Sequence, residues 1–249
     1  MSSAAPAVPP TEEQPLSEAQ RIVDTFVAPT KTFTDLRRSA NWLMPWLLMA
    51  IASIAMVAVV DRKLGMEKVV ENQLALQPKQ AAQLDKLSPE QRASQMQTII
   101  KFNYVVAYGY PVMIIVILAV VAGVLLASFN FGLGAELRFN QCVAVCMYAS
   151  LPFIPKALIA IVAVALGGAE GFTFQNPVAS NLSGLVDPSS HFLYTLATSL
   201  DLFTIWTLVL SGIGFSSLTR LRRGTCMGVV FGWWAIVVLA GAGIAAAFS

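Results

Sequence analysis

Long apolar runs without charge constrain this chain more than any other feature of its sequence. The clearest is Trp42 to Val60, nineteen residues with no Asp, Glu, Lys or Arg. At ~1.5 Å rise per residue, a helix of that length covers about 28 Å, close to the hydrocarbon thickness of a bilayer. Soluble domains are roughly 25% charged, whereas this chain is 12% charged and 56% hydrophobic. The sequence therefore predicts a polytopic membrane protein and excludes an ordinary soluble enzyme.

Four further apolar runs predict an all-α protein with five transmembrane helices. The expected spans are residues 42–60, 104–128, 142–166, 192–218 and 226–248, within a membrane domain of residues 42–249. The third span contains Pro152, Pro155 and Lys156. The fourth is longer than one membrane thickness, so either it tilts or its first turns lie in the interface.

The chain before the first span divides into two parts. Residues 1–17 hold four prolines among small and acidic residues and are expected to form a disordered tail. Residues 18–41 should form a short amphipathic interfacial segment, with Phe26 and Phe33 as its apolar anchors. Packing of this segment against the protein's own spans is an equally good alternative.

One polar insertion, residues 61–103, separates the first two spans. Apolar residues recur in it at helical spacing, so it should be a small helical hairpin, either a solvated cap on the bundle or a contact for a partner. Ser88, Pro89 and Gln91 make a strong helix start. The helix that begins there should continue into the second span.

Basic residues in the short loops predict the orientation. The loop 219–225 holds Arg220, Arg222 and Arg223, whereas the loop 167–191 holds no Lys or Arg. Because short basic loops remain in the cytoplasm, the N-terminus should be cytoplasmic and the C-terminus outside. The insertion 61–103 disagrees, since its seven Lys and Arg fall outside in this topology, but a long loop crosses with less regard to charge.

Several stretches resemble the Yip (Ypt/Rab-interacting) family of membrane proteins over roughly Arg21 to the C-terminus. The most specific are Tyr148-Ala149-Ser150-Leu151-Pro152 and Leu200-Asp201-Leu202-Phe203 followed by Trp206; the others are Phe26, Pro29, Thr30, Phe33, Trp42, Pro45, Gly132, Gly134, Phe139, Asn176, Pro177 and Ile205. The resemblance implies five membrane helices, a cytosolic N-terminus and no enzymatic activity.

The resemblance also suggests functions. Eukaryotic members of the family act with small GTPases in vesicle trafficking, and some prokaryotic relatives resemble accessory components of ABC-type exporters. The short polar N-terminal region and long first loop of this chain favour a multi-pass protein of a bacterial inner membrane. We therefore expect a non-catalytic, membrane-organising or accessory interaction subunit, with the bilayer and other membrane proteins, ABC-type exporter components among them, as partners. A GTPase-linked trafficking factor is an alternative.

Lys156 and Asp201 are the strongest candidates for an intramembrane ion pair. Each lies about ten residues from the outer end of its span, and the two spans are antiparallel neighbours. Unpaired charges at such depth cost at least ~2.5 kcal/mol each by insertion scales. Either the pair locks two helices together, with Asp201 also able to cap a helix start, or it serves a small channel or carrier.

Small residues in the last two spans are candidate helix-packing sites. Gly228 and Gly232 form a GxxxG step in the fifth span, and Gly212 with Ser216 makes a similar step in the fourth. Small residues allow helix backbones to approach closely. These steps should join the fourth and fifth spans or hold a second protomer in a homo-oligomer.

The sequence predicts no catalytic, cofactor-binding or metal-binding residues. Cys142, Cys146 and Cys226 should be small apolar residues inside the membrane, and the single histidine, His191, should lie in a loop or at the interface. An intramembrane enzyme would need a paired Asp, a ligand cluster or a Ser/His dyad at depth. The formal charge of +2 is too even for a nucleic-acid-binding surface.

Overall fold

The computed structural model describes residues 14–168 and 170–247, which contain helices and loops but no strand. In chain order the helices are α1 (Glu18–Val27), α2 (Pro29–Asp35), α3 (Leu43–Lys63), α4 (Met66–Ala75), α5 (Pro78–Asp85), α6 (Pro89–Ala127), α7 (Phe139–Ala149), α8 (Phe153–Ala165), α9 (His191–Ser199), α10 (Leu202–Leu218) and α11 (Arg223–Ala247). A π-helical turn, Ser128–Gly132, follows α6, and a 3-10 turn, Ser183–Leu185, precedes α9. Residues 1–13, most of the predicted disordered tail, lie outside the described residues.

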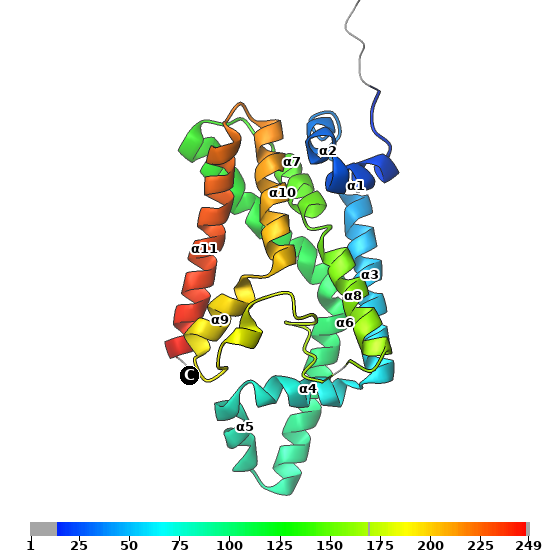
Figure 1. Cartoon of the computed structure of the whole chain (residues 1–249), viewed down its shortest axis with the longest axis vertical. Coiled ribbons are helices and arrows are strands. Elements are labelled where there is room, and N and C mark those ends of the chain that lie inside the picture. The colour runs from blue at the N-terminus through cyan, green and yellow to red at the C-terminus, as the bar shows by residue number, and fades with distance from the viewer. Residues whose placement is uncertain (1–13, 169, 248–249) are drawn as a thin grey trace, which may run out of the picture.

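Five spans form the body of the molecule, as the sequence predicts. Four helical stretches are long and apolar enough to cross a membrane: α3, α6 with its π-helical turn, α7 together with α8, and α11. The bent pair α9 and α10 makes a fifth when its two helices are counted as one span. These helices run along the long axis of the molecule, with α3 against α8 and α10 against α11 (Figure 1).

Two of the spans are interrupted, whereas the sequence predicted continuous helices over 142–166 and 192–218. The third begins at Phe139 and breaks at Ser150–Pro152, where proline supplies no N–H to the preceding turn. The fourth breaks at Leu200 and Asp201, and the axis of α10 is bent by 55° relative to that of α9. Here the Asp201 side chain accepts hydrogen bonds from the first backbone N–H groups of α10, which begins a new helix inside an apolar run.

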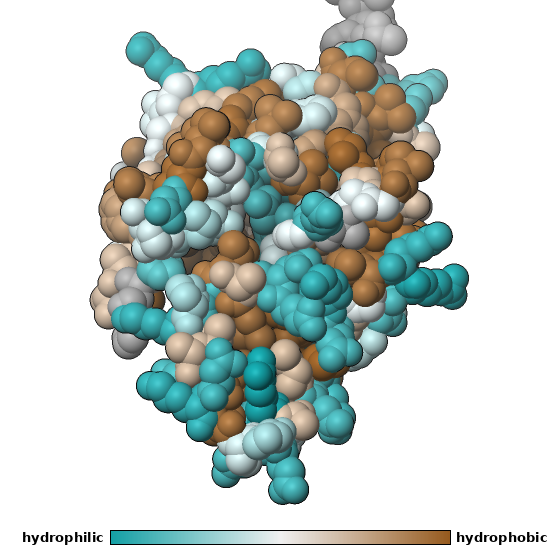
Figure 2. Space-filling model, turned by 60° about the horizontal axis from the view of Figure 1, so that its bottom comes forward, coloured by the Kyte–Doolittle hydropathy of each residue, from teal (hydrophilic) through white to brown (hydrophobic). Residues whose placement is uncertain are grey.

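A polar arm, made of α4, α5 and α6 up to Asn103, projects from one end of the bundle (Figure 1). Its buried side chains Val70, Leu74 and Leu84 form a small apolar cluster of their own. The predicted capping box at Ser88 and Gln91 is present, and α6 continues from it into the second span without a break. Hydrophilic side chains cover most of the arm, with hydrophobic patches between them (Figure 2).

At the opposite end, α1 and α2 form an N-terminal hairpin that packs on the bundle. The capping box predicted at Ser17 and Gln20 begins α1. Phe33 in α2 is 0% exposed and belongs to the main apolar core, which also contains Val145 of α7 and Phe215 of α10. The hairpin is therefore docked on the protein's own spans, which is the second of the two alternatives that the sequence left open.

Candidate functional site

The two helix breaks bring Lys156 and Asp201 into contact. Lys156 lies in the first turn of α8, just after the break at Pro152, and Asp201 is the N-cap of α10. The Lys156 Nζ atom lies 3.0 Å from Oδ2 of Asp201, and the two side chains are only 12% and 3% exposed. The two residues thus form the ion pair that the sequence suggested, and Asp201 is a helix cap as well.

The Asp201 carboxylate is hydrogen bonded on both oxygens. Its Oδ1 accepts from the backbone N–H groups of Phe203 at 3.0 Å and Thr204 at 3.1 Å. Its Oδ2 accepts from the Lys156 ammonium and from the Ser180 hydroxyl. The N-terminal end of the α10 dipole also favours a negative charge at this position. Asp201 therefore links three segments through its ion pair and hydrogen bonds: α8, α10 and the loop that contains Ser180.

Residues 170–190 of that loop fold back against the broken helices. The carbonyl of Ser180 accepts from the Leu202 N–H at 2.9 Å, and the Asn176 amide donates to the Ser183 hydroxyl at 3.2 Å. Sequence reasoning missed Ser180, although the loop's many Ser and Asn residues and its lack of Lys and Arg were a signal of internal hydrogen bonding. The loop is an ordered part of the site.

A cavity of about 310 Å³ lies between α3, α6 and α8. Lys156 and Ala157 contribute to its wall from α8, and the segment 174–177 of the fold-back loop closes one side. Most of the lining is apolar, with Ser53, Asn103, Tyr110 and Gln175 as its other polar residues. Lys156 thus contributes to the wall of the cavity, while its ammonium pairs with Asp201 and lies 5.9 Å from the centre of the Phe203 ring.

A second buried ion pair fixes the N-terminal hairpin. The Arg21 guanidinium donates from Nε and Nη2 to Oδ2 of Asp35, both at 2.7 Å. Its Nη1 lies 3.3 Å from Glu18, which also accepts a hydrogen bond from the Tyr148 hydroxyl at 2.8 Å. Burial, the largest single effect, opposes the charged form of Arg21, but the hydrogen bonds and electrostatic interactions with Asp35 and Tyr148 together outweigh it, so the pKa of the guanidinium is raised above its usual value.

This second pair shows that the N-terminal segment buries a charged residue as well as its apolar anchor. Asp35 lies two residues after Phe33 in α2, and both side chains are buried. The reason is that Asp35 faces Arg21 across the hairpin, and two oppositely charged groups can be buried together when they are hydrogen bonded. Phe26, the other predicted anchor, is half-buried and meets the Trp206 ring edge-on at 5.6 Å.

The small-residue steps separate into two kinds. Gly212 is buried where α10 meets α11, and a Cβ atom there would collide with the Met227 side chain; Ser216 is half-buried on the same helix. Gly228 and Gly232 are exposed on α11, and a Cβ atom on either would meet nothing within 4 Å among the described residues. The step at Gly228 and Gly232 therefore does not join the fourth and fifth spans.

The remaining candidates for chemistry are buried thiols. Cys142, Cys146 and Cys226 are all free and buried, as expected of small apolar residues in the membrane. Within residues 14–168 and 170–247, no group of three or more His, Cys, Asp or Glu side chains is arranged to hold a metal ion.

The fold and the site define a class: a polytopic helical membrane protein in which two broken spans meet at a buried ion pair. The family model of the Yip1 domain matches residues 23–245. The chain therefore belongs to the Yip1 domain family, and the resemblance to this family is confirmed. No curated protein and no solved structure matches the chain.

The two stretches on which the resemblance was mainly based coincide with the two helix breaks. The Tyr148–Pro152 stretch ends α7, and the Leu200–Phe203 stretch joins α9 to α10. Their shared position next to the Lys156 and Asp201 pair explains why residues so far apart in the sequence belong to one site.

Proposed function

We propose that this protein is a non-catalytic accessory subunit that binds other membrane proteins, with components of an ABC-type exporter as the first candidates. The observation that carries the proposal is the polar arm. It extends beyond the spans, has its own apolar cluster, and presents two short helices whose outer residues, such as Gln80 and Gln83, are exposed. A polar element that projects beyond the spans is suited to contact a partner outside the bilayer.

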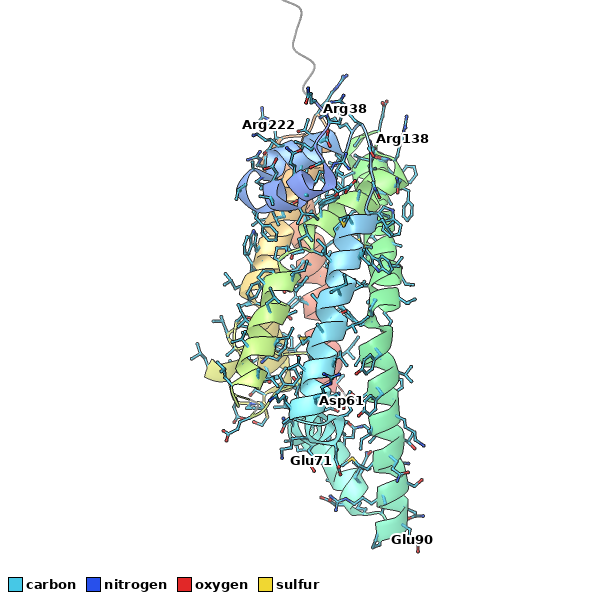
Figure 3. The ribbon with its side chains drawn as sticks, turned by 90° about the vertical axis from the view of Figure 1, so that its right-hand side faces the viewer. Arg38, Asp61, Glu71, Glu90, Arg138 and Arg222 are labelled. Carbon is cyan, nitrogen blue, oxygen red and sulfur yellow. The ribbon has the colours of Figure 1, made fainter. Side chains whose placement is uncertain are left out.

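The proposed location is a bacterial inner membrane with the N-terminal hairpin in the cytoplasm. Among the described residues, the hairpin end carries eight basic and four acidic side chains: Arg21, Lys31, Arg37, Arg38, Arg138, Arg220, Arg222 and Arg223 against Glu18, Asp24, Asp35 and Glu136. The arm end carries seven of each sign, counting residues 61–103 with Glu170 and Asp187. Figure 3 has Arg38, Arg138 and Arg222 together at one end and Asp61, Glu71 and Glu90 toward the other. The excess of positive charge at the hairpin end supports this orientation.

Reporter fusions test the orientation. A reporter that is active only in the cytoplasm should work at Ser17 and in the loop Arg220–Arg223, and should fail after Ser249. Activity at all three positions would contradict the odd number of spans, and activity only after Ser249 would reverse the orientation.

Photo-cross-linking in native membranes tests the accessory role. A photoreactive amino acid at Gln80 or Gln83 should capture the same membrane-protein partner, identified by mass spectrometry. The matched control is Val112, which is exposed on the spanning part of α6 and should capture lipid or nothing. Capture of exporter subunits from the arm would support the first candidate, whereas the trafficking alternative predicts capture of a small GTPase from the cytoplasmic hairpin end. Arm positions that yield no protein cross-link would contradict the proposal.

A small channel or carrier is the second candidate, supported by the cavity beside Lys156 and by the broken helices around it. Interrupted spans with a site between them are typical of many transporters. Proteoliposomes that hold the wild-type chain should then pass an ion or small solute, and Lys156→Met should abolish that flux. Equal leakage in the two preparations would remove this candidate.

A further inference from the structure

We propose that the cavity beside Lys156 binds one hydrocarbon chain whose carbonyl end accepts a hydrogen bond from the Lys156 ammonium. The proposal concerns a ligand of the protein itself and does not depend on the accessory role. Its basis is the combination of an apolar cavity, a cation with donors to spare, and a location inside the membrane.

The shape and lining of the cavity favour a chain. The volume of about 310 Å³ is at the lower end of the range for small-molecule sites. Along α6 the lining runs from Asn103 to Ile114, which is eleven residues or about 16 Å of helix. Met49, Val57 and Phe153 add apolar walls from α3 and α8. An elongated, mostly apolar space of this kind fits a hydrocarbon chain.

Lys156 determines which end group the site prefers. Among the described residues its ammonium makes one hydrogen bond, to Asp201, although it has three N–H donors. The adjacent carboxylate already balances its charge, so a second full negative charge would be repelled. A neutral carbonyl oxygen has no such penalty and gains strength from the low dielectric. The preferred ligand is therefore an acyl ester or a protonated fatty acid.

Two lining residues indicate how a chain reaches the site. Tyr110 and Gln175 both contribute to the cavity wall and are both exposed, so the cavity communicates with the outer surface of the protein. Tyr110 belongs to the spanning part of α6, where the surface faces lipid. An acyl chain can therefore enter from the bilayer without crossing water.

Photoaffinity labelling of the full chain in nanodiscs tests the proposal. Two probes carry a diazirine near the end of an acyl chain: one is a free fatty acid and the other a phospholipid. Saturable labelling is expected on the cavity-lining parts of α3 and α6, residues 49–57 and 103–114. Labelling by the fatty acid alone identifies a free acid as the ligand, and labelling by the phospholipid identifies a membrane lipid; either supports the carbonyl chemistry.

Filling the cavity provides the decisive comparison. Ala107→Phe and Ala157→Leu place bulk at two wall positions that are 8% and 9% exposed, and each should lower labelling of the cavity about tenfold or more. Val105→Phe lies two residues away on α6 at a position that is 71% exposed, and should change nothing. The two fillers lie on different helices, so a folding defect in one leaves the other to decide.

The last variant examines the end group. Lys156→Met combined with Asp201→Asn removes the ammonium without leaving a lone charge, and should weaken saturable labelling about tenfold. Labelling that spreads evenly over lipid-facing surfaces, or that persists unchanged in both filled variants, would overturn the proposal. Full labelling of the double variant would overturn the role assigned to Lys156.

Discussion

The two buried ion pairs make a useful comparison because they have similar chemistry in different surroundings. Arg21 and Asp35 lie fourteen residues apart, within one hairpin, and the guanidinium uses its Nε, Nη1 and Nη2 groups on Asp35 and Glu18. Lys156 and Asp201 lie forty-five residues apart on two broken spans, and the ammonium donates to one carboxylate beside a cavity. The first pair is enclosed by its partners, whereas the second has unused donors.

The difference shows why a buried ion pair does not by itself identify a functional site. A hydrogen-bonded pair in tight packing holds its segments together and has nothing left to bind. The same pair beside an apolar cavity offers a polar group to whatever enters. In this protein, the surroundings of the cation and its unused donors, rather than the pair itself, distinguish the two regions.

The largest expected effect is loss of the enclosed pair. Arg21→Met leaves Asp35 buried without its cation, and should destabilise the detergent-solubilised protein by about 3–5 kcal/mol, which corresponds to ~6 °C or more in Tm. Because the pKa of Arg21 is raised in the folded protein, the contribution of the pair to stability is fully present below the pKa that Arg21 has in the unfolded chain. It is lost only as the pH rises through the pKa of Arg21 in the folded protein. Deprotonation of the arginine therefore causes no loss of stability at physiological pH.

Two further variants serve as controls for this measurement. Lys31→Met changes an exposed cation on the same hairpin and should leave Tm unchanged. Arg21→Met combined with Asp35→Asn should recover part of the loss. If Arg21→Met behaves like Lys31→Met, the hairpin is not held by this pair.

A smaller, asymmetric effect is expected at the second pair. Asp201→Ala removes the cap of α10 and the acceptor for Ser180 as well as the ion pair, and should cost about 2–4 kcal/mol. Lys156→Met removes one donor from a carboxylate that keeps its other hydrogen bonds, and should cost less. The Tm values of Lys156→Met, of Asp201→Asn and of the two changes combined form a double-mutant cycle, in which the double variant should lose less than the sum of its singles. Strictly additive losses would mean that the two side chains are not coupled.

The sequence predicted the spans better than their interruptions. Charge-free runs of membrane length determine where a helix crosses, because each unsatisfied backbone group costs several kcal/mol in lipid. The breaks depend on single residues, namely Pro152 and the capping carboxylate of Asp201, which are compatible with either a kinked or a broken helix. The similar depth predicted for Lys156 and Asp201 in the membrane was sufficient to predict that the two residues form a pair.

Neither the burial of Asp35 nor the presence of the cavity could be predicted from the sequence, and the reason is physical. Asp35 is buried because a turn at Ala28 places α1 against α2, so its partner Arg21 comes from another helix. The cavity arises because α3, α6 and α8 do not fill the space between them. The sequence of one helix alone does not show whether such a space is left. Both features depend on the packing of several helices, whereas periodicity describes one helix at a time.

The smallest effects concern glycines, and they test which faces of the last two spans are in contact. A Cβ atom at Gly214 would lie 2.6 Å from the Val145 side chain and 3.0 Å from the Phe33 ring, so Gly214→Ala should cost about 1–3 kcal/mol by overpacking. Gly228→Ala meets nothing within 4 Å among the described residues, and alanine favours helix over glycine by up to ~1 kcal/mol. This variant should therefore be neutral or slightly stabilising in detergent, as measured by Tm. A clear loss at Gly228, together with a smaller particle in size-exclusion chromatography, would instead mean that the exposed face of α11 holds a second copy of the chain.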